Sequence, residues 1–131
     1  MTANGRILVV DDYPDAREFI RVLLEGAGFI VCTAASGEEA VAVACDESPD
    51  AVLMDLHLPG TSGVEATRRI KSIAGLKDTP VIAYTAREDY ARGWGDLFFD
   101  VCSKPCRLGK LLALIDAALV SRGDVGPPRI A

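Results

Sequence analysis

Several side chains that could do chemistry follow directly after short apolar runs. They are Asp11 and Asp12 after ILVV, Asp55 after AVLM, Thr85 after VIAY and Lys104 after VCS. Adjacent carboxylates beside an apolar core raise each other's pKa unless a positive charge lies near them. A divalent cation supplies that charge, and Mg²⁺ prefers carboxylate oxygens together with water and a phosphate. The pattern predicts a cation site next to an amine and a hydroxyl that can contact a phosphoryl oxygen. An acidic turn that caps the next helix would also explain the adjacent pair.

Five short apolar runs predict the strands that position these side chains. They cover 6–10, 29–34, 51–55, 80–85 and 99–103. Segments of helical period separate them, and strands that alternate with helices through short links form a parallel, doubly wound α/β sheet. Ligands bind such sheets at the carboxyl ends of the strands. All five candidate side chains are therefore expected to face one crevice.

Amphipathic patterns predict the helices between these strands. The first and the last helix each carry an apolar stripe at helical spacing. The stripes comprise Ala16, Phe19, Ile20, Leu23 and Ala27 in the first helix, and Leu108, Leu111, Leu112, Ile115 and Leu119 in the last. Ser36 followed by Glu39 is typical of a capping box, and Ser62 begins another helix. Residues 87–98 contain two glycines, so we expect them to be the least regular part of the fold.

Composition indicates one globular domain without a nucleic-acid or membrane footprint. The 131 residues include 14 Lys and Arg against 19 Asp and Glu, for a net charge of −5, and half of them are hydrophobic. No block of Lys and Arg stands out, which argues against nucleic acid or an anionic membrane as partner. The first residues lack the apolar run of a signal peptide, and no stretch is long enough to span a membrane. We therefore expect a cytoplasmic location.

The four cysteines show no C-x-x-C spacing. They lie at positions 32, 45, 102 and 106. In a reducing compartment such cysteines are small core or surface residues more often than a disulfide framework, and that is our prediction for all four. Because Cys102 and Cys106 bracket Lys104, a redox role there is the less favoured alternative.

Four motifs occur in an order that carries a family resemblance. They are LVVDD, LMDLHLPGTSG, VIAYTA and SKP. Together they resemble the receiver domain of two-component response regulators, over residues 5–121. The resemblance implies a flavodoxin-like, three-layer (βα)5 fold with strand order 2-1-3-4-5. It also implies a receiver domain over 1–121. The tail over 122–131 is rich in glycine and proline, so we expect it to be flexible.

The resemblance also assigns roles at the predicted crevice. It makes Asp55 the phosphoryl acceptor, with Thr85 and Lys104 binding the phosphoryl group. The Mg²⁺ ligands that it implies are Asp11, Asp12, Asp55 and the backbone carbonyl of His57, with Asp12 a more direct ligand than Asp11. It further implies a cis peptide bond between Lys104 and Pro105.

The resemblance implies partners as well. A histidine kinase or phosphotransfer protein would donate the phosphoryl group from a phosphohistidine, and an unidentified downstream protein would read the change. The chain would catalyse only its own phosphorylation and dephosphorylation and would not be a free-standing enzyme. We expect a monomer or weak dimer. Because no output domain follows residue 121, we expect the readout to be protein contact, whether the chain is a complete short regulator or a receiver cut from a larger hybrid kinase or regulator.

Three features depart from the family pattern. Val101 stands where the family usually has an aromatic residue three positions before the lysine. The segment between Thr85 and Lys104 is a few residues shorter than usual. His57 and Arg87 occupy the positions that flank the path of the attacking water, so both could alter the lifetime of an acyl phosphate.

Other functions remain open at this point. A receiver-fold module that binds partners without phosphate is favoured by the altered segment before Lys104. A phosphatase of the haloacid dehalogenase type needs a carboxylate two residues after its nucleophile, where this chain has His57. A flavodoxin-like electron carrier needs a phosphate-cradling loop, whereas Asp11 and Asp12 would repel a phosphate.

Overall fold

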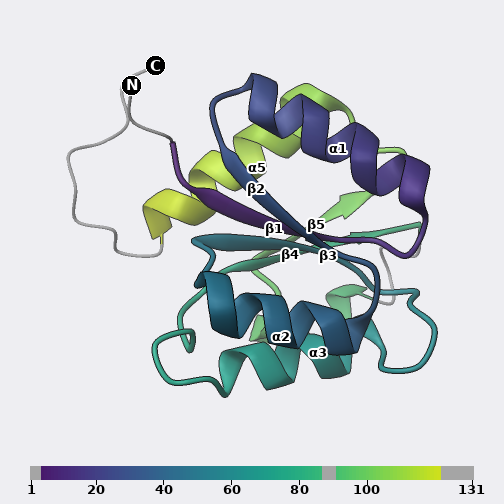
Figure 1. Ribbon diagram of the computed structural model, residues 1–131, viewed down its shortest axis with the longest axis vertical. Helices are drawn as coiled ribbons and strands as arrows, with labels where there is room; N and C mark the ends of the chain where they lie inside the picture. The colour runs from purple at the N-terminus through teal and green to yellow at the C-terminus, as the bar shows by residue number, and fades with distance from the viewer. Residues whose placement is uncertain (1–3, 87–90, 122–131) are drawn as a thin grey trace.

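The computed structural model describes residues 4–86 and 91–121 (Figure 1). Its strands are β1 (Arg6–Val10), β2 (Ile30–Ala34), β3 (Ala51–Asp55), β4 (Val81–Thr85) and β5 (Asp100–Ser103). Its helices are α1 (Pro14–Gly26), α2 (Gly37–Glu47), α3 (Gly63–Lys71) and α5 (Leu108–Ser121), with a short 3₁₀ helix η1 (Gly95–Leu97). None of the helices in these ranges is long and apolar enough to cross a membrane.

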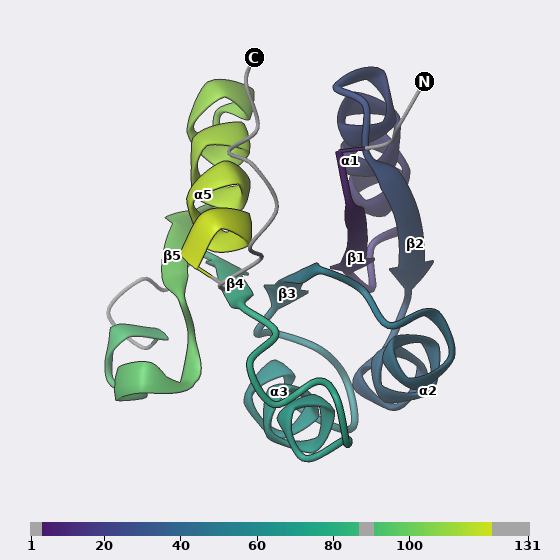
Figure 2. The same cartoon turned by 90° about the vertical axis from the view of Figure 1, so that its left-hand side faces the viewer.

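The strands form one parallel sheet in the order β2-β1-β3-β4-β5. Helices α1 and α5 cover one face of this sheet, and α2 and α3 cover the other (Figures 1 and 2). The predicted doubly wound, three-layer architecture and its strand order are therefore confirmed.

Two apolar clusters, one on each face, explain why the central strands are continuous apolar runs. Every residue of β3 is buried, because its side chains alternate between the two faces. Met54 packs in the cluster beneath α2 and α3. Leu53 packs in the cluster beneath α1 and α5. Burial on both faces fixes the register, since a slip of one residue would exchange the two sets of side chains.

Serine caps begin α2 and α3 as the sequence predicts. The hydroxyl oxygen of Ser36 accepts a hydrogen bond from the Glu39 amide at 3.1 Å, and that of Ser62 accepts one from Glu65 at 3.1 Å. The Glu39 carboxylate accepts a hydrogen bond from the amide of Ala35, one residue before the cap, whereas in a capping box it bonds the amide of the cap residue itself. These caps satisfy amides that have no partner inside the helix.

The predicted stripe of α1 is partly wrong. Ile20 is buried as expected, but the Phe19 side chain is 65% exposed, whereas Leu24 is fully buried. The helix is therefore rotated so that Leu24 rather than Phe19 faces the sheet. The predicted stripe of α5 fits better, because Leu111 and Ile115 are both buried.

The described part of the connection between β4 and β5 is irregular, as expected. After a short helical segment at 91–92, the chain continues through Trp94 into η1, and Gly95 adopts a φ of +59°. The Trp94 ring lies 4.9 Å from the guanidinium carbon of Arg68, which attaches this connection to α3. The position of Arg87 and the predicted tail 122–131 lie outside the described residues.

Gly63 lets α3 begin close to the end of β3. A Cβ at this position would overlap the carbonyl oxygen of Asp55 and lie 2.8 Å from the Leu56 Cα. A Gly63→Ala substitution should therefore lower the free energy of unfolding by about 1–3 kcal/mol, because backbone atoms would have to move. Urea denaturation measures the loss. Gly109→Ala is the matched control, since a Cβ there meets nothing within 4 Å, and it should leave stability unchanged or slightly raised.

Candidate functional site

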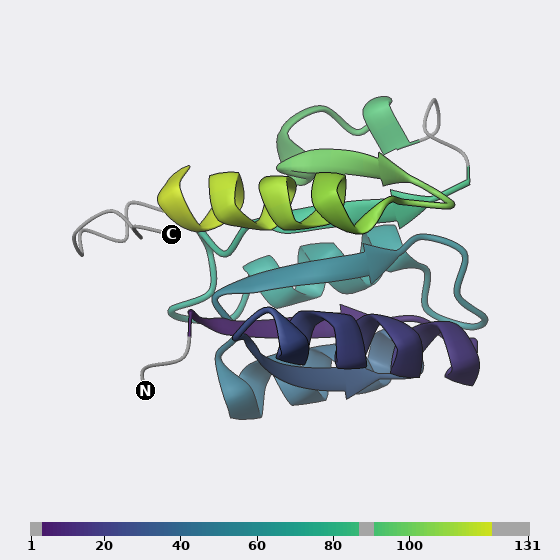
Figure 3. The ribbon, with the colours of Figure 1, turned by 90° about the horizontal axis from the view of Figure 1, so that it is seen from above.

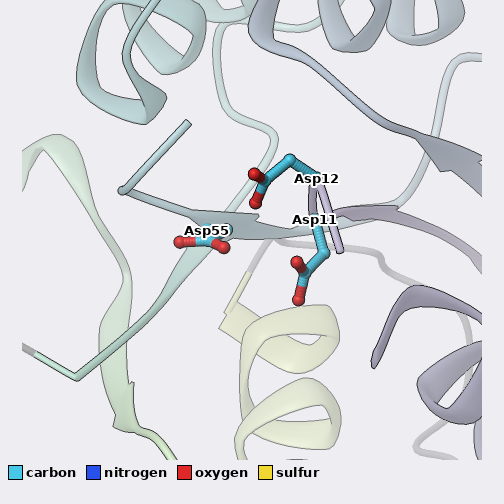
Figure 4. A group of neighbouring side chains, drawn as sticks. All are labelled: Asp11, Asp12 and Asp55. Atoms are coloured by element: carbon cyan, nitrogen blue, oxygen red, sulfur yellow. The ribbon is translucent and has the colours of Figure 1, made fainter. Parts of the chain in front are cut away.

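The strands of the sheet all end at one edge, where the predicted site lies (Figure 3). Val10 is in register with Met54, so the residues that follow them, Asp11 and Asp55, are neighbours. Asp12 joins them, and oxygen atoms of the three carboxylates lie within 4.8 Å of one another (Figure 4). The structure thus brings together the three acidic residues that the sequence singled out.

Asp55 is held on both of its oxygens. Its side chain is buried, and its Oδ1 accepts a hydrogen bond from the backbone amide of His57 at 2.9 Å. Its Oδ2 accepts one from the Lys104 ammonium, also at 2.9 Å. Contacts of this kind fix the carboxylate in one orientation, which positions it for any reaction in which it takes part.

Asp11 is a buried carboxylate, and only one of its two oxygens accepts a hydrogen bond from a described residue. Its Oδ1 accepts a hydrogen bond from the Tyr13 amide at 2.9 Å. Its Oδ2 is buried and makes no hydrogen bond to any described residue, although the Lys104 ammonium is 3.7 Å away. Burial raises the pKa of Asp11, as do the charges of Asp55 and Asp12, and the Tyr13 amide and Lys104 offset this only in part.

Lys104 supplies the positive charge at the centre of the site. Burial alone would lower its pKa, but the hydrogen bond and charge of Asp55, helped by Asp11, outweigh burial and raise the pKa. The backbone positions this side chain, because the Lys104 amide donates to the carbonyl of Thr85 at 2.9 Å. Thr85 itself is fully buried at the end of β4. The expected cis bond between Lys104 and Pro105 is present.

Tyr84 is a contact of Lys104 that the sequence prediction missed. The Lys104 ammonium lies 4.8 Å from the centroid of the Tyr84 ring, and Tyr84 is in register with Asp55 on β3. An aromatic ring beneath a partly desolvated ammonium stabilises its charge. Tyr84 lies on the neighbouring strand and not three positions before the lysine, so sequence spacing assigned its ring no role at the site.

This contact predicts different effects of two substitutions at Tyr84. Tyr84→Leu should lower the pKa of Lys104, because it removes the ring face beside the ammonium. Tyr84→Phe retains the ring and should leave that pKa close to the wild-type value. An NMR titration of the Lys104 side chain measures both, and an equal pKa in the two variants would contradict a role for the ring.

The prediction for the cysteines is wrong for one pair. The sulfur atoms of Cys102 and Cys106 are joined in a disulfide, whereas Cys32 and Cys45 are free. Cys102 lies in β5, one residue before the strand ends, and Cys106 lies just before α5. Their approach depends on the path of the chain between these two elements, so the less favoured redox alternative is the one that the pair fits.

The carboxylates have the donor chemistry of a site for a hard divalent cation. Such a cation takes oxygen ligands, and Mg²⁺ in proteins takes one or two carboxylates with water and a phosphate. The leftover Oδ2 of buried Asp11 and the exposed carboxylate of Asp12 are suitable oxygens on the same edge as Asp55. The His57 backbone adjoins them through its hydrogen bond to Asp55. Its carbonyl as a further ligand stays a prediction.

Sequence comparison relates the chain to response regulators. PhoB, the phosphate regulon transcriptional regulatory protein of Pseudomonas aeruginosa, is 38% identical over 120 residues, which is 89% of this chain and 52% of PhoB. PilH of the same organism is 38% identical over 118 residues, which is 88% of this chain and 98% of PilH. The DNA-binding response regulator MtrA of Mycolicibacterium smegmatis is 33% identical over 123 residues. The chain spans about half the length of PhoB and MtrA and nearly all of PilH.

Solved structures agree with this relation. The chemotaxis protein CheY4 of Vibrio cholerae superposes with a TM-score of 0.82 at 28% identity, covering 89% of this chain and all of CheY4. The receiver domain of a Pseudomonas aeruginosa sensor histidine kinase gives a TM-score of 0.81 at 30% identity, over 90% of this chain and 99% of that domain, and it holds a magnesium ion in its active-site cleft. Residues 7–116 match the family model of the response regulator receiver domain. The chain therefore belongs to the receiver-domain family of two-component signalling proteins.

Proposed function

We propose that this receiver domain is a phosphorylation switch whose acceptor is Asp55. Receiver domains are signalling switches that interact with histidine kinases and downstream targets. The observation that carries the proposal is the buried Asp55 carboxylate, held 2.9 Å from the Lys104 ammonium beside two further carboxylates. Asp11, Asp12, Asp55 and the His57 carbonyl would hold Mg²⁺.

The geometry supports a direct transfer to Asp55. One oxygen of the Asp55 carboxylate attacks the phosphorus of a phosphohistidine, the P–N bond breaks and an acyl phosphate forms. Bound Mg²⁺ would neutralise charge on the transferring group. The Lys104 ammonium, already beside Asp55, then contacts a phosphoryl oxygen, and the Thr85 hydroxyl donates to another. Hydrolysis of the acyl phosphate returns the switch to its resting state.

The modification changes the surface that partners meet. A phosphoryl group adds about −1.5 to −2 charges at neutral pH. Lys104 must exchange its bond to Asp55 for a bond to the new group, and Thr85 lies in the adjoining strand. We therefore propose that the surface formed by residues 85–86 and 91–105 changes on phosphorylation and that a downstream protein reads it.

Intact-protein mass spectrometry tests this proposal. The protein is incubated with a small phosphodonor, with and without Mg²⁺, as wild type and as Asp55→Asn. The expected result is a gain of one phosphoryl mass that needs both Mg²⁺ and Asp55. Asp46→Asn, at an exposed carboxylate of α2, is the matched control and should be labelled like wild type. No gain in folded wild type would instead favour a module that binds its partners without phosphate.

A further inference from the structure

Cys102 and Cys106 lie on either side of the Lys104–Pro105 dipeptide, and a disulfide joins them. Their Cα atoms are 5.9 Å apart, within the range of about 4.4–6.8 Å that disulfides span. The backbone thus brings both thiols to bonding distance in the folded protein. We propose that this pair is a thiol–disulfide modification site that fixes Lys104 beside Asp55. The effect on signalling rests on the function proposed above.

The two sulfurs differ in access, which assigns them different parts in the reaction. Cys102 is fully buried on β5, in the apolar cluster beneath α1 and α5. Cys106 is partly exposed at the rim of the same cluster, just before α5 begins at Leu108. An external reagent therefore reaches Cys106 first, and Cys102 is placed to resolve the intermediate.

The chemistry balances with a small disulfide such as oxidised glutathione as the oxidant. The Cys106 thiolate attacks one sulfur of the oxidant, its S–S bond breaks, and one glutathione thiol leaves. The Cys102 thiolate then attacks the Cys106 sulfur of the mixed disulfide and releases the second glutathione thiol. Two protein thiols have lost two electrons and two protons, and the oxidant has gained them. A dithiol reductant reverses both steps.

The bond closes a small ring around Lys104. Cys102 is in register with Tyr84, whose ring lies beneath the Lys104 ammonium. On the other side, Cys106 leads into α5. The disulfide therefore ties the start of α5 to β5 and limits how far the segment that carries Lys104 can move. Reduction removes that covalent restraint and returns conformational freedom to the segment.

The other two cysteines do not share these features. Cys32 is half-buried on β2, and burial raises the pKa of its thiol to about 11, which leaves it almost wholly protonated at neutral pH. Cys45 is exposed on α2, which covers the opposite face of the sheet from α5. A protein with Cys32→Ser and Cys45→Ser, here called the pair-only variant, therefore isolates the site.

Peptide mass spectrometry tests whether the site forms. Trypsin does not cleave before proline, so residues 93–107 leave as one peptide that holds both Cys102 and Cys106. After the folded pair-only variant is treated with oxidised glutathione, this peptide should be lighter by two hydrogen atoms. Free thiols or stable glutathione adducts on this peptide would overturn the proposal. Adding Cys106→Ser gives the matched control, which cannot form the disulfide.

Phosphoryl incorporation tests what the bond does. The oxidised pair-only variant should be labelled at Asp55 roughly three to ten times faster than the same protein reduced with dithiothreitol, because small displacements of a positioned group slow such reactions strongly. The Cys106→Ser control should be labelled at one rate under both conditions. Equal rates for the oxidised and reduced pair-only variant would overturn the proposal.

A further readout separates this inference from the proposed function. If neither form is labelled, the proposed function fails, and the pKa of Lys104 measured by NMR decides about the disulfide. A higher Lys104 pKa in the oxidised than in the reduced variant supports fixation beside Asp55. An equal pKa in the two forms would overturn it.

Discussion

Replacement of Lys104 by methionine should slow phosphoryl incorporation at Asp55 by about 100-fold, the loss typical when one preorganised donor is removed from a charged transition state. Methionine keeps much of the length of lysine but carries no charge. In the resting protein the Lys104 ammonium donates to Asp55 Oδ2 at 2.9 Å, so it is already where charge gathers on the transferring group. Time-resolved mass spectrometry with a small phosphodonor and Mg²⁺ gives the rate.

A second lysine provides the control for this experiment. Lys110 is exposed on α5, and Lys110→Met changes the net charge by the same amount. The Lys110→Met protein should be labelled at the wild-type rate. Circular dichroism confirms that both variants are folded. Wild-type labelling of a folded Lys104→Met protein would contradict the role assigned to the ammonium.

Asp11→Asn should stabilise the metal-free protein and weaken its binding of Mg²⁺. The Asp11 Oδ2 is buried without a hydrogen bond to any residue of the described ranges, so its charge opposes folding. Removal of that charge should raise the free energy of unfolding by about 1 kcal/mol in the absence of Mg²⁺. A lost metal ligand should weaken Mg²⁺ binding at least as much as a lost outer contact, which costs about 10–100-fold. Urea denaturation and calorimetric titration measure the two effects.

The contribution of Asp11 to the free energy of unfolding depends on pH with a definite sign. Burial makes the pKa of Asp11 higher in the folded than in the unfolded protein, so the folded state binds this proton more tightly. The Asp11 carboxyl therefore opposes folding at neutral pH, and that cost should disappear as the pH falls through the raised pKa. The Asp11→Asn protein should lack this gain. A stability difference that is independent of pH would contradict the assignment.

Asp12→Asn is the matched control for Asp11→Asn. Asp12 is exposed, so its charge costs the fold little, and its removal should leave the stability of the metal-free protein unchanged. Its removal should still weaken Mg²⁺ binding. Equal stabilisation by both substitutions would mean that burial of Asp11 is not the cause.

The architecture followed from periodicity, and the errors in the strand bounds lie at the strand starts. β1 and β3 have the predicted bounds, whereas the other strands begin one residue later than predicted. Phe29 illustrates the reason, because its amide donates to the Leu24 carbonyl and so belongs to the end of α1. An apolar residue that packs in the core looks the same in sequence whether its backbone belongs to a ladder or to a turn.

The candidate site was predicted in part for a related reason. Asp11, Asp12, Asp55 and Lys104 meet because all of them follow apolar strands, and the edge where parallel strands end is fixed by topology. Tyr84 beneath Lys104 and the disulfide from Cys102 to Cys106 depend instead on register between strands and on the turn at Pro105. The periodicity of apolar residues along the sequence carries no information about the Tyr84 contact or the disulfide.

The contact of Trp94 with Arg68 gives the molecule an optical property. Trp94 is the single tryptophan of the chain, so all indole emission comes from the connection between β4 and β5. A guanidinium 4.9 Å from the ring perturbs that emission only while the connection stays on α3. Separation of the two elements would thus shift the intrinsic fluorescence of the unlabelled protein, and the connection can be followed in real time without an introduced dye.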